Sequence, residues 1–346
     1  MPRIETSAPR GARTLLALTL ALVAAQASAV QTLRPERTLR LELEDSTAEA
    51  PRSAVATAVA LSPNGDRILA GADDHRLWEW RTETGELLGR REGHTDWVRG
   101  VRFSTDGEWV ATVSDDRRLR VYKGDTLSTT DLAPGGLACS AFHPDGQRLI
   151  VAGRTQAARL YRLPEGELVE TFGCPCGDTR SVAFSPDGSR MAAAGGSGVL
   201  RVWDLASGEA VHDFDTGGRR VRAVAFSPDG RLVAAAGDGP LCRLWDVISG
   251  ESAGEIAIRP AKAFAVAFLA DREVAIGGSD NAIRSYDVYS GSPMRRFEGH
   301  TGTVAAMTIN ADRTKMVTAG FDATVRVWPL KRDDVALAPT AAGVGR

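Results

Sequence analysis

The chain has 346 residues, of which 43% are hydrophobic and 25% charged, and 36 are glycine. This composition is typical of a globular protein rich in turns, and a repeat array can fill such a length as one domain. The formal net charge of −2 supplies no basic excess, which argues against general binding to nucleic acid.

The first 29 residues have the pattern of an export signal. Three arginines precede an apolar run over residues 14–25, and Ala27, Ser28 and Ala29 then have the small side chains of a cleavage site. The run of about a dozen residues is too short to span a bilayer comfortably, although an uncleaved anchor is the alternative. We therefore predict cleavage after Ala29, export to a periplasm or the extracellular space, and a mature chain without a transmembrane segment.

One phrase recurs along the rest of the chain at a nearly constant period. Its clearest copies, at residues 200–208, 242–250 and 283–291, run from an apolar residue through an aromatic-Asp pair to Ser-Gly. The aromatic position recurs every 39 to 42 residues in seven copies, a spacing that indicates radial repetition of one structural unit. These aromatic residues are Trp80, Tyr122, Tyr161, Trp203, Trp245, Tyr286 and Trp328.

Each period carries four short β-rich segments separated by turn residues. In one period these segments are residues 221–227, 231–237, 242–247 and 251–257. Asp229-Gly230 marks the first turn of that period, because glycine tolerates the positive φ that tight hairpins require. Such a unit predicts a four-stranded antiparallel meander.

The chain resembles the WD-repeat family of β-propellers over about residues 37–330. The resemblance implies an all-β fold, a seven-bladed β-propeller of four-stranded antiparallel blades, with one blade for each aromatic position. The last repeat stops after its third strand, and polar and apolar residues alternate over residues 38–43, before the first blade. We therefore expect this N-terminal strand to close the ring as the outer strand of the last blade. The expected domains are a signal peptide over 1–29, the propeller over 30–330 and a flexible C-terminal tail over 331–346.

The resemblance also implies buried structural tetrads, in which a histidine, a Ser or Thr, an aspartate and a tryptophan hydrogen-bond in series. One tetrad is complete and consists of His300, Thr318, Asp322 and Trp328. A second tetrad has tyrosine in the tryptophan position and consists of His94, Thr112, Asp116 and Tyr122. Two further blades keep only the aspartate, as Asp74 and Asp280. We expect packing to hold blades three to five, where the acid is replaced by Thr155, Ser197 and Gly239.

His300, Thr318 and Asp322 also supply the residue types of a nucleophilic triad. We interpret them as structural, because the same spacing recurs in another blade and a catalytic hydroxyl must face a pocket. The sequence also lacks the haem, zinc, nucleophile-elbow and phosphate-loop motifs that would indicate other chemistry. We therefore predict no catalytic residue, no metal and no cofactor.

The four cysteines fall into two pairs of different character. Cys139 and Cys242 lie in apolar strand patterns, and we expect them to be buried. Cys174 and Cys176 flank Pro175 in a predicted loop. For these two a tight disulfide, a pair of free thiols and a share in a metal site all remain open.

In propellers similar to this one, partners dock on the loop face, where the loops joining successive blades meet the turns between the second and third strands. We expect basic residues of blades three to six to form an arc on that face, beside aromatic side chains of blades six, seven and two. Such residues are enriched at interface hot spots, and a basic arc suits an acidic segment. The alternative is a solvated rim that Asp178 and Asp238 neutralise. The predicted partner-binding residues are Trp97, Arg99, Arg154, Arg180, Arg220, Arg222, Lys262, Phe264 and Phe321.

These patterns favour a non-catalytic protein–protein interaction scaffold of the cell envelope, which binds a protein or peptide with an acidic segment and no nucleic acid. The first alternative is a propeller enzyme of the metal-dependent hydrolase type, with its ion in the central channel. That site needs converging carboxylates or histidines, whereas the inner strands offer mainly Ala, Val, Ser and Arg. The second alternative is a module that binds sugar or cell wall through the aromatic residues.

Overall fold

The computed structural model describes residues 30–43, 53–132, 135–258 and 262–330. Within these ranges every regular element is a β-strand, and the strands form seven antiparallel sheets. The predicted all-β, seven-bladed architecture is therefore confirmed. No helix within these ranges has the length and apolar character that crossing a membrane requires.

The sheets are the blades of the propeller, and each blade runs from an innermost to an outermost strand. Blade one consists of β3 (Ala56–Leu61), β4 (Arg67–Ala72), β5 (Leu77–Arg81) and β6 (Leu87–Arg91). Blade two consists of β7 (Val98–Phe103), β8 (Trp109–Ser114), β9 (Arg118–Lys123) and β10 (Thr126–Leu132). Blade three consists of β11 (Leu137–Phe142), β12 (Arg148–Gly153), β13 (Ala157–Arg162) and β14 (Glu167–Gly173).

The remaining blades follow in chain order, except that two N-terminal strands join the last two blades. Blades four to seven consist of β15 (Thr179–Phe184), β16 (Arg190–Gly195), β17 (Val199–Asp204) and β18 (Ala210–Asp215); β19 (Val221–Phe226), β20 (Leu232–Gly237), β21 (Leu241–Asp246) and β22 (Ser252–Ala257); β23 (Ala263–Ala270), β24 (Glu273–Gly278), β25 (Ile283–Asp287) and β26 (Pro293–Phe297) with β1 (Gln31–Leu33); and β27 (Val304–Ile309), β28 (Lys315–Gly320) and β29 (Thr324–Pro329) with β2 (Arg37–Arg40).

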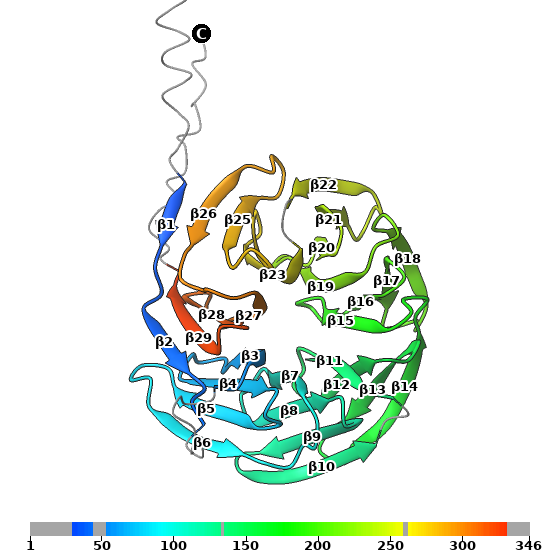
Figure 1. Cartoon of the computed structure of the whole chain (residues 1–346). Coiled ribbons are helices and arrows are strands. Elements are labelled where there is room, and N and C mark those ends of the chain that lie inside the picture. Colours follow the sequence, from blue (N-terminus) through cyan, green and yellow to red (C-terminus); the bar gives the residue numbers. More distant parts are fainter. Residues whose placement is uncertain (1–29, 44–52, 133–134, 259–261, 331–346) are drawn as a thin grey trace, which may run out of the picture. The chain divides into compact units, whose positions relative to one another are not determined.

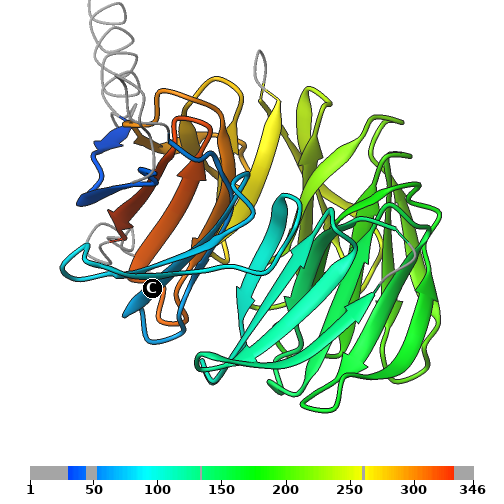
Figure 2. The same ribbon diagram turned by 60° about the horizontal axis from the view of Figure 1, so that its bottom comes forward.

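The blades are arranged in a ring about a common axis, as Figures 1 and 2 show. Innermost strands of consecutive blades are in contact from β3 through β7, β11, β15, β19 and β23 to β27, and β27 contacts β3 in turn. On the inner side of the ring, the first and last blades are therefore in contact with each other.

A recurring Ser-x-Asp-Gly sequence shapes the turn between the first and second strands. In blade five the Oγ of Ser227 accepts the backbone N–H of Leu232 at 2.8 Å, and the carboxylate of Asp229 accepts the N–H of Arg231 at 3.0 Å. Gly230 has a φ of 72°, in the left-handed region where a side chain is strained. The local sequence thus specifies the turn before any tertiary contact forms.

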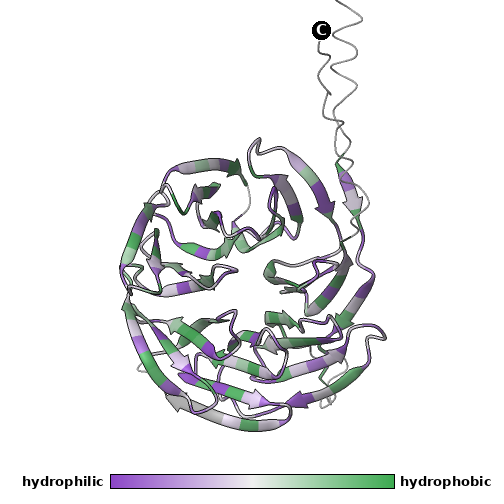
Figure 3. Cartoon of the chain, turned by 180° about the vertical axis from the view of Figure 1, so that it is seen from behind, coloured by the Kyte–Doolittle hydropathy of each residue, from purple (hydrophilic) through white to green (hydrophobic). Residues whose placement is uncertain are grey.

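The hydrophobic core is divided into layers that lie between neighbouring blades. One layer combines Leu200 and Phe214 of blade four with Val221, Val233 and Trp245 of blade five. Figure 3 shows hydrophobic and hydrophilic residues alternating along the strands, because successive side chains face opposite sides of a sheet. Each repeat therefore needs its neighbours to bury its apolar surface, which explains why the repeats fold as a ring.

Strand β2 closes the ring as predicted, although it is shorter than the predicted segment. It pairs with β29 from Arg37 to Arg40, and Arg40 lies opposite Thr324, the first residue of β29. One further backbone bond, from the N–H of Leu41 to the carbonyl of Ala323 at 3.2 Å, lies beyond the regular pairing. Leu39 and Leu41 are buried against residues of both blade seven and blade one, so the closing strand also packs the two blades together.

Blade six has a fifth strand that the repeat pattern did not predict. Strand β1 lies at the outer edge of β26, where the carbonyl of Leu33 accepts the N–H of Glu298 at 3.0 Å. Arg34 forms an ion pair with Glu298 at 3.0 Å. The prediction of four strands per blade therefore holds for the other six blades. An unpaired sheet edge readily accepts a passing segment, and three residues are too few to show a strand pattern.

Two predicted segments lie outside the described residues. These are the signal peptide over 1–29 and the flexible tail over 331–346. Both remain predictions from the sequence.

Candidate functional site

One backbone hydrogen bond recurs in all seven blades and builds the loop face. In each blade the donor is the backbone N–H of a residue in the turn between the second and third strands. The acceptor is the carbonyl of a residue one position before the innermost strand, at 2.8 to 3.1 Å. The loops joining successive blades are thereby fixed against these turns. The donor and acceptor pairs are Asp73 and Val55, Asp115 and Trp97, Arg154 and Gly136, Gly196 and Asp178, Asp238 and Arg220, Ser279 and Lys262, and Phe321 and Thr303.

Three predicted partner-binding arginines have aspartate partners on this face. The Nε of Arg99 donates to Asp115, and Arg222 donates to Asp238 in the same way, each at 2.7 Å. Arg180 makes the equivalent bond to Asp178, also at 2.7 Å. The alternative of a rim neutralised by Asp178 and Asp238 therefore describes Arg180 and Arg222 of the predicted arc, whose half-buried guanidinium groups are ion-paired.

Other cations of the loop face keep more of their charge. Arg154 shares Asp115 with Arg99, at 3.2 Å. Arg220 and Lys262 are exposed, and among the described residues neither side chain has a carboxylate partner in hydrogen-bond range. Burial alone would raise the pKa of Asp238, but the bond from Arg222 and the nearby charges of Arg222, Lys262 and Arg220 lower it overall. A net positive charge therefore remains around this part of the face.

The predicted aromatic side chains lie against these arginines. The guanidinium of Arg99 lies 4.4 Å from the ring centre of Trp97, and that of Arg222 lies 4.5 Å from the ring centre of Phe264. Phe264 is half-buried and meets Phe321 edge to face, with ring centres 6.4 Å apart. Trp97 and Phe321 remain 39% and 47% exposed, which is high for residues of this size.

The inner strands enclose an axial channel of about 140 Å³. Four arginines line it, and no Asp, Glu or His among the described residues does so. In the same part of the chain no three His, Cys, Asp or Glu side chains gather as a metal site would require. A channel with cationic walls repels a metal ion, so the geometry gives the hydrolase alternative no support.

The complete tetrad forms a continuous series of hydrogen bonds in blade seven. Trp328 Nε1 donates to Thr318 Oγ1 at 2.9 Å, Thr318 Oγ1 lies 2.8 Å from His300 Nε2, and His300 Nδ1 lies 3.0 Å from Asp322. An indole only donates and an ionised carboxylate only accepts, so Thr318 Oγ1 accepts from Trp328 and His300 Nδ1 carries the proton that Asp322 accepts. All four side chains are buried or nearly so, and the threonine hydroxyl faces no pocket.

The second tetrad is shortened to three members. His94 Nδ1 lies 2.7 Å from Asp116, and its Nε2 lies 2.8 Å from Thr112. Tyr122 does not continue this series; its ring instead lies 5.5 Å from the guanidinium of Arg91. A phenol has its polar atom at the end of the ring, so it does not reproduce the position of an indole N–H.

Burial and hydrogen bonding set the charges of these groups. Burial lowers the pKa of His94 below 6.5, although Asp116 acts in the opposite direction. Burial alone would raise the pKa of Asp116, but bonds from His94 and from the backbone of Arg118 and Thr95 lower it overall. The pKa of Asp322 is lowered for the same reasons. Each histidine–aspartate pair is thus held as an ionised carboxylate beside an imidazole.

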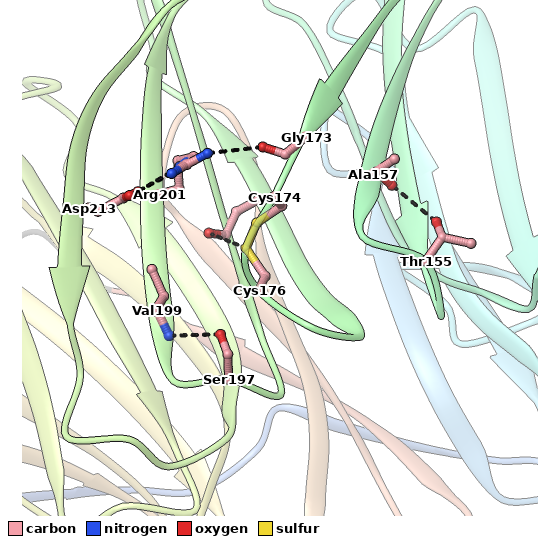
Figure 4. The surroundings of a disulfide bond; sticks show 10 residues. Thr155, Ala157, Gly173, Cys174, Cys176, Ser197, Val199, Arg201 and Asp213 are labelled. Atoms are coloured by element: carbon pink, nitrogen blue, oxygen red, sulfur yellow. Dashed lines mark hydrogen bonds and ion pairs between the residues drawn. A yellow bond between two sulfur atoms is a disulfide. The ribbon is translucent and has the colours of Figure 1, made fainter.

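A disulfide occupies the corresponding loop position in blade four. Cys174-Pro175-Cys176 stands at the same distance before Phe184 as Gly93-His94-Thr95 stands before Phe103. Figure 4 shows the disulfide that joins Cys174 and Cys176, whose Cα atoms lie 5.0 Å apart. The carbonyl of Cys176 accepts the N–H of Ser197 at 3.0 Å. Of the three open states for this pair, the structure thus has the disulfide, which lies within the loop. The backbone bond from Ser197 ties this loop to the turn between β16 and β17, where we expected packing alone.

Two further contacts escaped the sequence reasoning. The indole of Trp78 donates to Asp74 at 3.1 Å, and the guanidinium of Arg284 donates to Asp280 at 2.6 Å. Both donors lie four residues after the aspartate, at the position of Arg326 in blade seven. Reading the third strand at this position, as well as at the aromatic one, would have found them.

The comparison with protein families agrees with this architecture. The family description "WD domain, G-beta repeat" matches residues 46–81, 85–123, 166–204, 208–246 and 291–329, which together exceed half of the chain. The chain belongs to the WD-repeat family. The repeats around Tyr161 and Tyr286 lie between the matched segments, and both nevertheless fold as WD-repeat blades.

Relatives share only part of the chain. The periodic tryptophan protein 2 homolog of Schizosaccharomyces pombe is 30% identical over 109 residues, which are 30% of this chain and 12% of that protein. The pre-rRNA-processing protein IPI3 of Mycosarcoma maydis is 31% identical over 87 residues, 25% of this chain and 15% of that protein. The serine-threonine kinase receptor-associated protein of Gallus gallus is 37% identical over 75 residues, 22% of this chain and 21% of that protein. The matches thus span well under a third of each relative.

These relatives correct the predicted localisation. They are eukaryotic proteins, one named for pre-rRNA processing and one for association with a receptor kinase, so the prediction of export to a periplasm or the extracellular space is wrong. That prediction depended on the arginines and apolar run near the N-terminus. A short run of small and apolar residues satisfies the pattern by composition alone, independently of the repeats that follow.

Proposed function

We propose that this WD-repeat propeller is a non-catalytic interaction module that binds a partner protein or peptide on its loop face. The observation that carries the proposal is the pair of arginine–aromatic contacts on that face, Arg99 with Trp97 and Arg222 with Phe264. Aromatic and arginine side chains dominate binding energy when they are held rigid at the centre of an interface.

The ion pairs support this proposal by restricting the arginines before binding. Asp115 and Asp238 hold Arg99 and Arg222 in place, so less side-chain entropy is lost when a partner docks. Exposed parts of Trp97 and Phe321 then provide apolar area beside fixed charge. Such a surface suits a partner that inserts an apolar side chain between the two aromatic groups.

Charge favours a partner segment with acidic residues. The three ion-paired arginines contribute little net charge, whereas Arg220 and Lys262 add uncompensated positive charge next to Asp238. Exposed charges of this kind act mainly on the rate of association. The acidic segment would therefore contact the face at blades five and six, not along the whole predicted arc.

The names of two relatives accord with a binding role. One is called a receptor-associated protein and another a processing protein. Because each match covers a small share of the relative, we carry over only the general role of an interaction propeller.

The test is partner capture by the tagged full-length chain, compared with the double variant Trp97→Ala/Phe321→Ala. The matched control is Ile248→Ala/Tyr289→Ala, which removes two exposed apolar side chains from turns between the third and fourth strands, at the opposite end of the blades. We expect the first variant to lose captured partners at an unchanged melting temperature, with a cost of about 2 kcal/mol or more for a hot-spot residue. Loss of partners in the control alone would overturn the proposal.

A further inference from the structure

The axial channel is a concave site lined by four arginines. Arg99 and Arg102 line it from β7, Arg180 from β15 and Arg222 from β19. The aspartates that pair with three of these arginines do not line the channel themselves. A ligand in the channel therefore meets guanidinium groups from several directions and no carboxylate of the described residues.

Arg102 is unlike the residues at its equivalent positions in the other blades. The pairing of the first two strands of each blade identifies these positions. Each is the residue of the innermost strand that precedes the position equivalent to Phe103. Arg102 pairs with Ala111, as Ala225 pairs with Ala234 in blade five. The equivalent residues of the other blades are Ala60, Ala141, Ala183, Ala225, Ala267 and Thr308. One long cation thus projects from a ring of small side chains.

The contacts of Arg102 leave most of its hydrogen-bonding capacity open. Its Nη1 donates to the carbonyl of Val101 at 2.8 Å, and no carboxylate of the described residues contacts it. Burial lowers the pKa of this guanidinium, as expected for a desolvated cation without an acidic neighbour. A guanidinium still remains charged at neutral pH, so the fold bears an uncompensated charge at a position where alanine suffices elsewhere.

The three other arginines present the same group to a ligand. Arg99, Arg180 and Arg222 each use Nε and Nη2 for their aspartates. Among the described residues, Nη1 of each has no hydrogen-bond partner. A guanidinium has five N–H donors, and the aspartates engage only one edge of the fork. Each arginine therefore retains donors while it is held in place.

We propose that the axial channel is a binding site for a phosphate group, with Arg102 as its principal ligand. A phosphate monoester carries nearly two negative charges and three acceptor oxygens at neutral pH, so it matches donors that converge from three strands. A single carboxylate is planar and has one charge, so it offers fewer acceptor oxygens and less charge to these arginines than a phosphate does. The channel site does not require a protein partner, because it is formed by the inner strands alone.

The first experiment measures binding of phosphate to the full-length chain. Inorganic phosphate and a pentapeptide with a central phosphoserine flanked by glycines are titrated calorimetrically, at an ionic strength held constant with sodium chloride. We expect saturable binding in the wild type and at least tenfold weaker binding in Arg102→Ala. That variant introduces the residue found in neighbouring blades, so it should fold. Arg162→Ala, which removes one exposed arginine from the outer part of blade three, should bind like the wild type.

The two probes distinguish the source of the phosphate. Tighter binding of the phosphoserine peptide than of inorganic phosphate assigns the site to a phosphorylated side chain, and the reverse order assigns it to a free phosphate. The same peptide with glutamate in place of phosphoserine should bind at least tenfold more weakly than the phosphopeptide. Equal binding of the glutamate peptide, unchanged binding in Arg102→Ala, or no saturable binding of either phosphate probe would overturn the proposal. The Trp97→Ala/Phe321→Ala variant should retain phosphate binding, which separates this site from the partner-binding surface.

Discussion

The guanidinium of Arg222 lies 4.5 Å from the ring centre of Phe264 while its Nε donates to Asp238. The arginine is therefore fixed on two sides, by a carboxylate and by an aromatic ring of the next blade. A cation held over an aromatic face gains attraction to the ring without giving up its ion pair. This contact couples blades five and six on the loop face and makes an aromatic surface rigid.

Charge reversal at the two unpaired cations should slow partner association. We expect Arg220→Glu/Lys262→Glu to lower the association rate constant, because an acidic partner would then be repelled. Surface plasmon resonance at several salt concentrations measures this effect. In the wild type the rate should fall as salt rises, and in the variant that trend should disappear. An equal rate in both proteins at low salt would show that the partner is not acidic.

His300→Ala should destabilise the fold without affecting any chemistry. The substitution removes one hydrogen-bond partner from each of the buried side chains of Thr318 and Asp322, at a cost of about 1–3 kcal/mol in the free energy of unfolding. Denaturant unfolding followed by tryptophan fluorescence measures the loss. The exposed substitution Glu209→Ala should change stability by about 0.5 kcal/mol or less. A similar small effect for both variants would contradict a structural role for the tetrad.

Stability should decrease on acidification in two steps. Folding lowers the pKa of His94 from 6.5, so below about pH 6.5 the unfolded chain binds more protons than the folded chain and the free energy of unfolding falls. Folding also lowers the pKa of Asp116 from 3.8, and that of Asp322, so a second decrease begins near pH 4. Both contributions are fully present at neutral pH.

Unfolding measurements across pH 3 to 8 test this sequence of steps. His94→Gln should be less stable throughout but should lose part of the pH dependence between pH 5 and 6.5, whereas the dependence near pH 4 remains. A wild-type stability that rises on acidification through pH 6 would mean that His94 gains a proton on folding.

Removal of residues 30–43 should open the ring. The deletion takes away β1 and β2 and exposes the edges of β26 and β29, which then favour strand pairing between molecules. Light scattering after size-exclusion chromatography should show association of the deletion variant at a lowered melting temperature. Deletion of residues 331–346 should leave both properties unchanged. A monomeric deletion variant with normal melting would show that the closing strand is dispensable.

The disulfide of blade four should contribute modestly to stability. A bridge across so short a loop restricts the unfolded chain little, so its removal in Cys176→Ser should cost on the order of 1–2 kcal/mol. Reducing agent should destabilise the wild type by a similar amount and have no further effect on the variant. If reductant destabilises both proteins equally, the effect arises elsewhere.

Local patterns predicted the repeating framework well. The turn at Asp229-Gly230 and the four strands around it lie within one or two residues of their predicted positions. Hydrogen bonds between residues two to five apart specify such a turn, so its sequence is sufficient. By contrast, β1 was missed, because its pairing depends on the edge of β26, more than 250 residues away.

For the candidate site, the sequence placed side chains correctly but not their charge states. Alignment of the repeats brings Arg180, Arg222 and Phe264 onto one face, and the structure has them there. It did not establish that Asp178 and Asp238 bind the two arginines. The choice between a free arc and a neutralised rim depends on side-chain rotamers and on separations of a few ångströms, which a strand pattern does not contain.

The sequence by itself determined the number of blades, the turn chemistry and the members of the complete tetrad in blade seven, because each follows from the identity and spacing of residues within one repeat. Only the tertiary structure decided which charges are compensated and which are not. Arg99 and Arg102 lie three residues apart on the same strand, yet among the described residues Arg99 has a carboxylate partner and Arg102 has none. That difference arises because Asp115 reaches only the loop-face end of the channel, and the position of a turn relative to a channel exists only once the ring has closed.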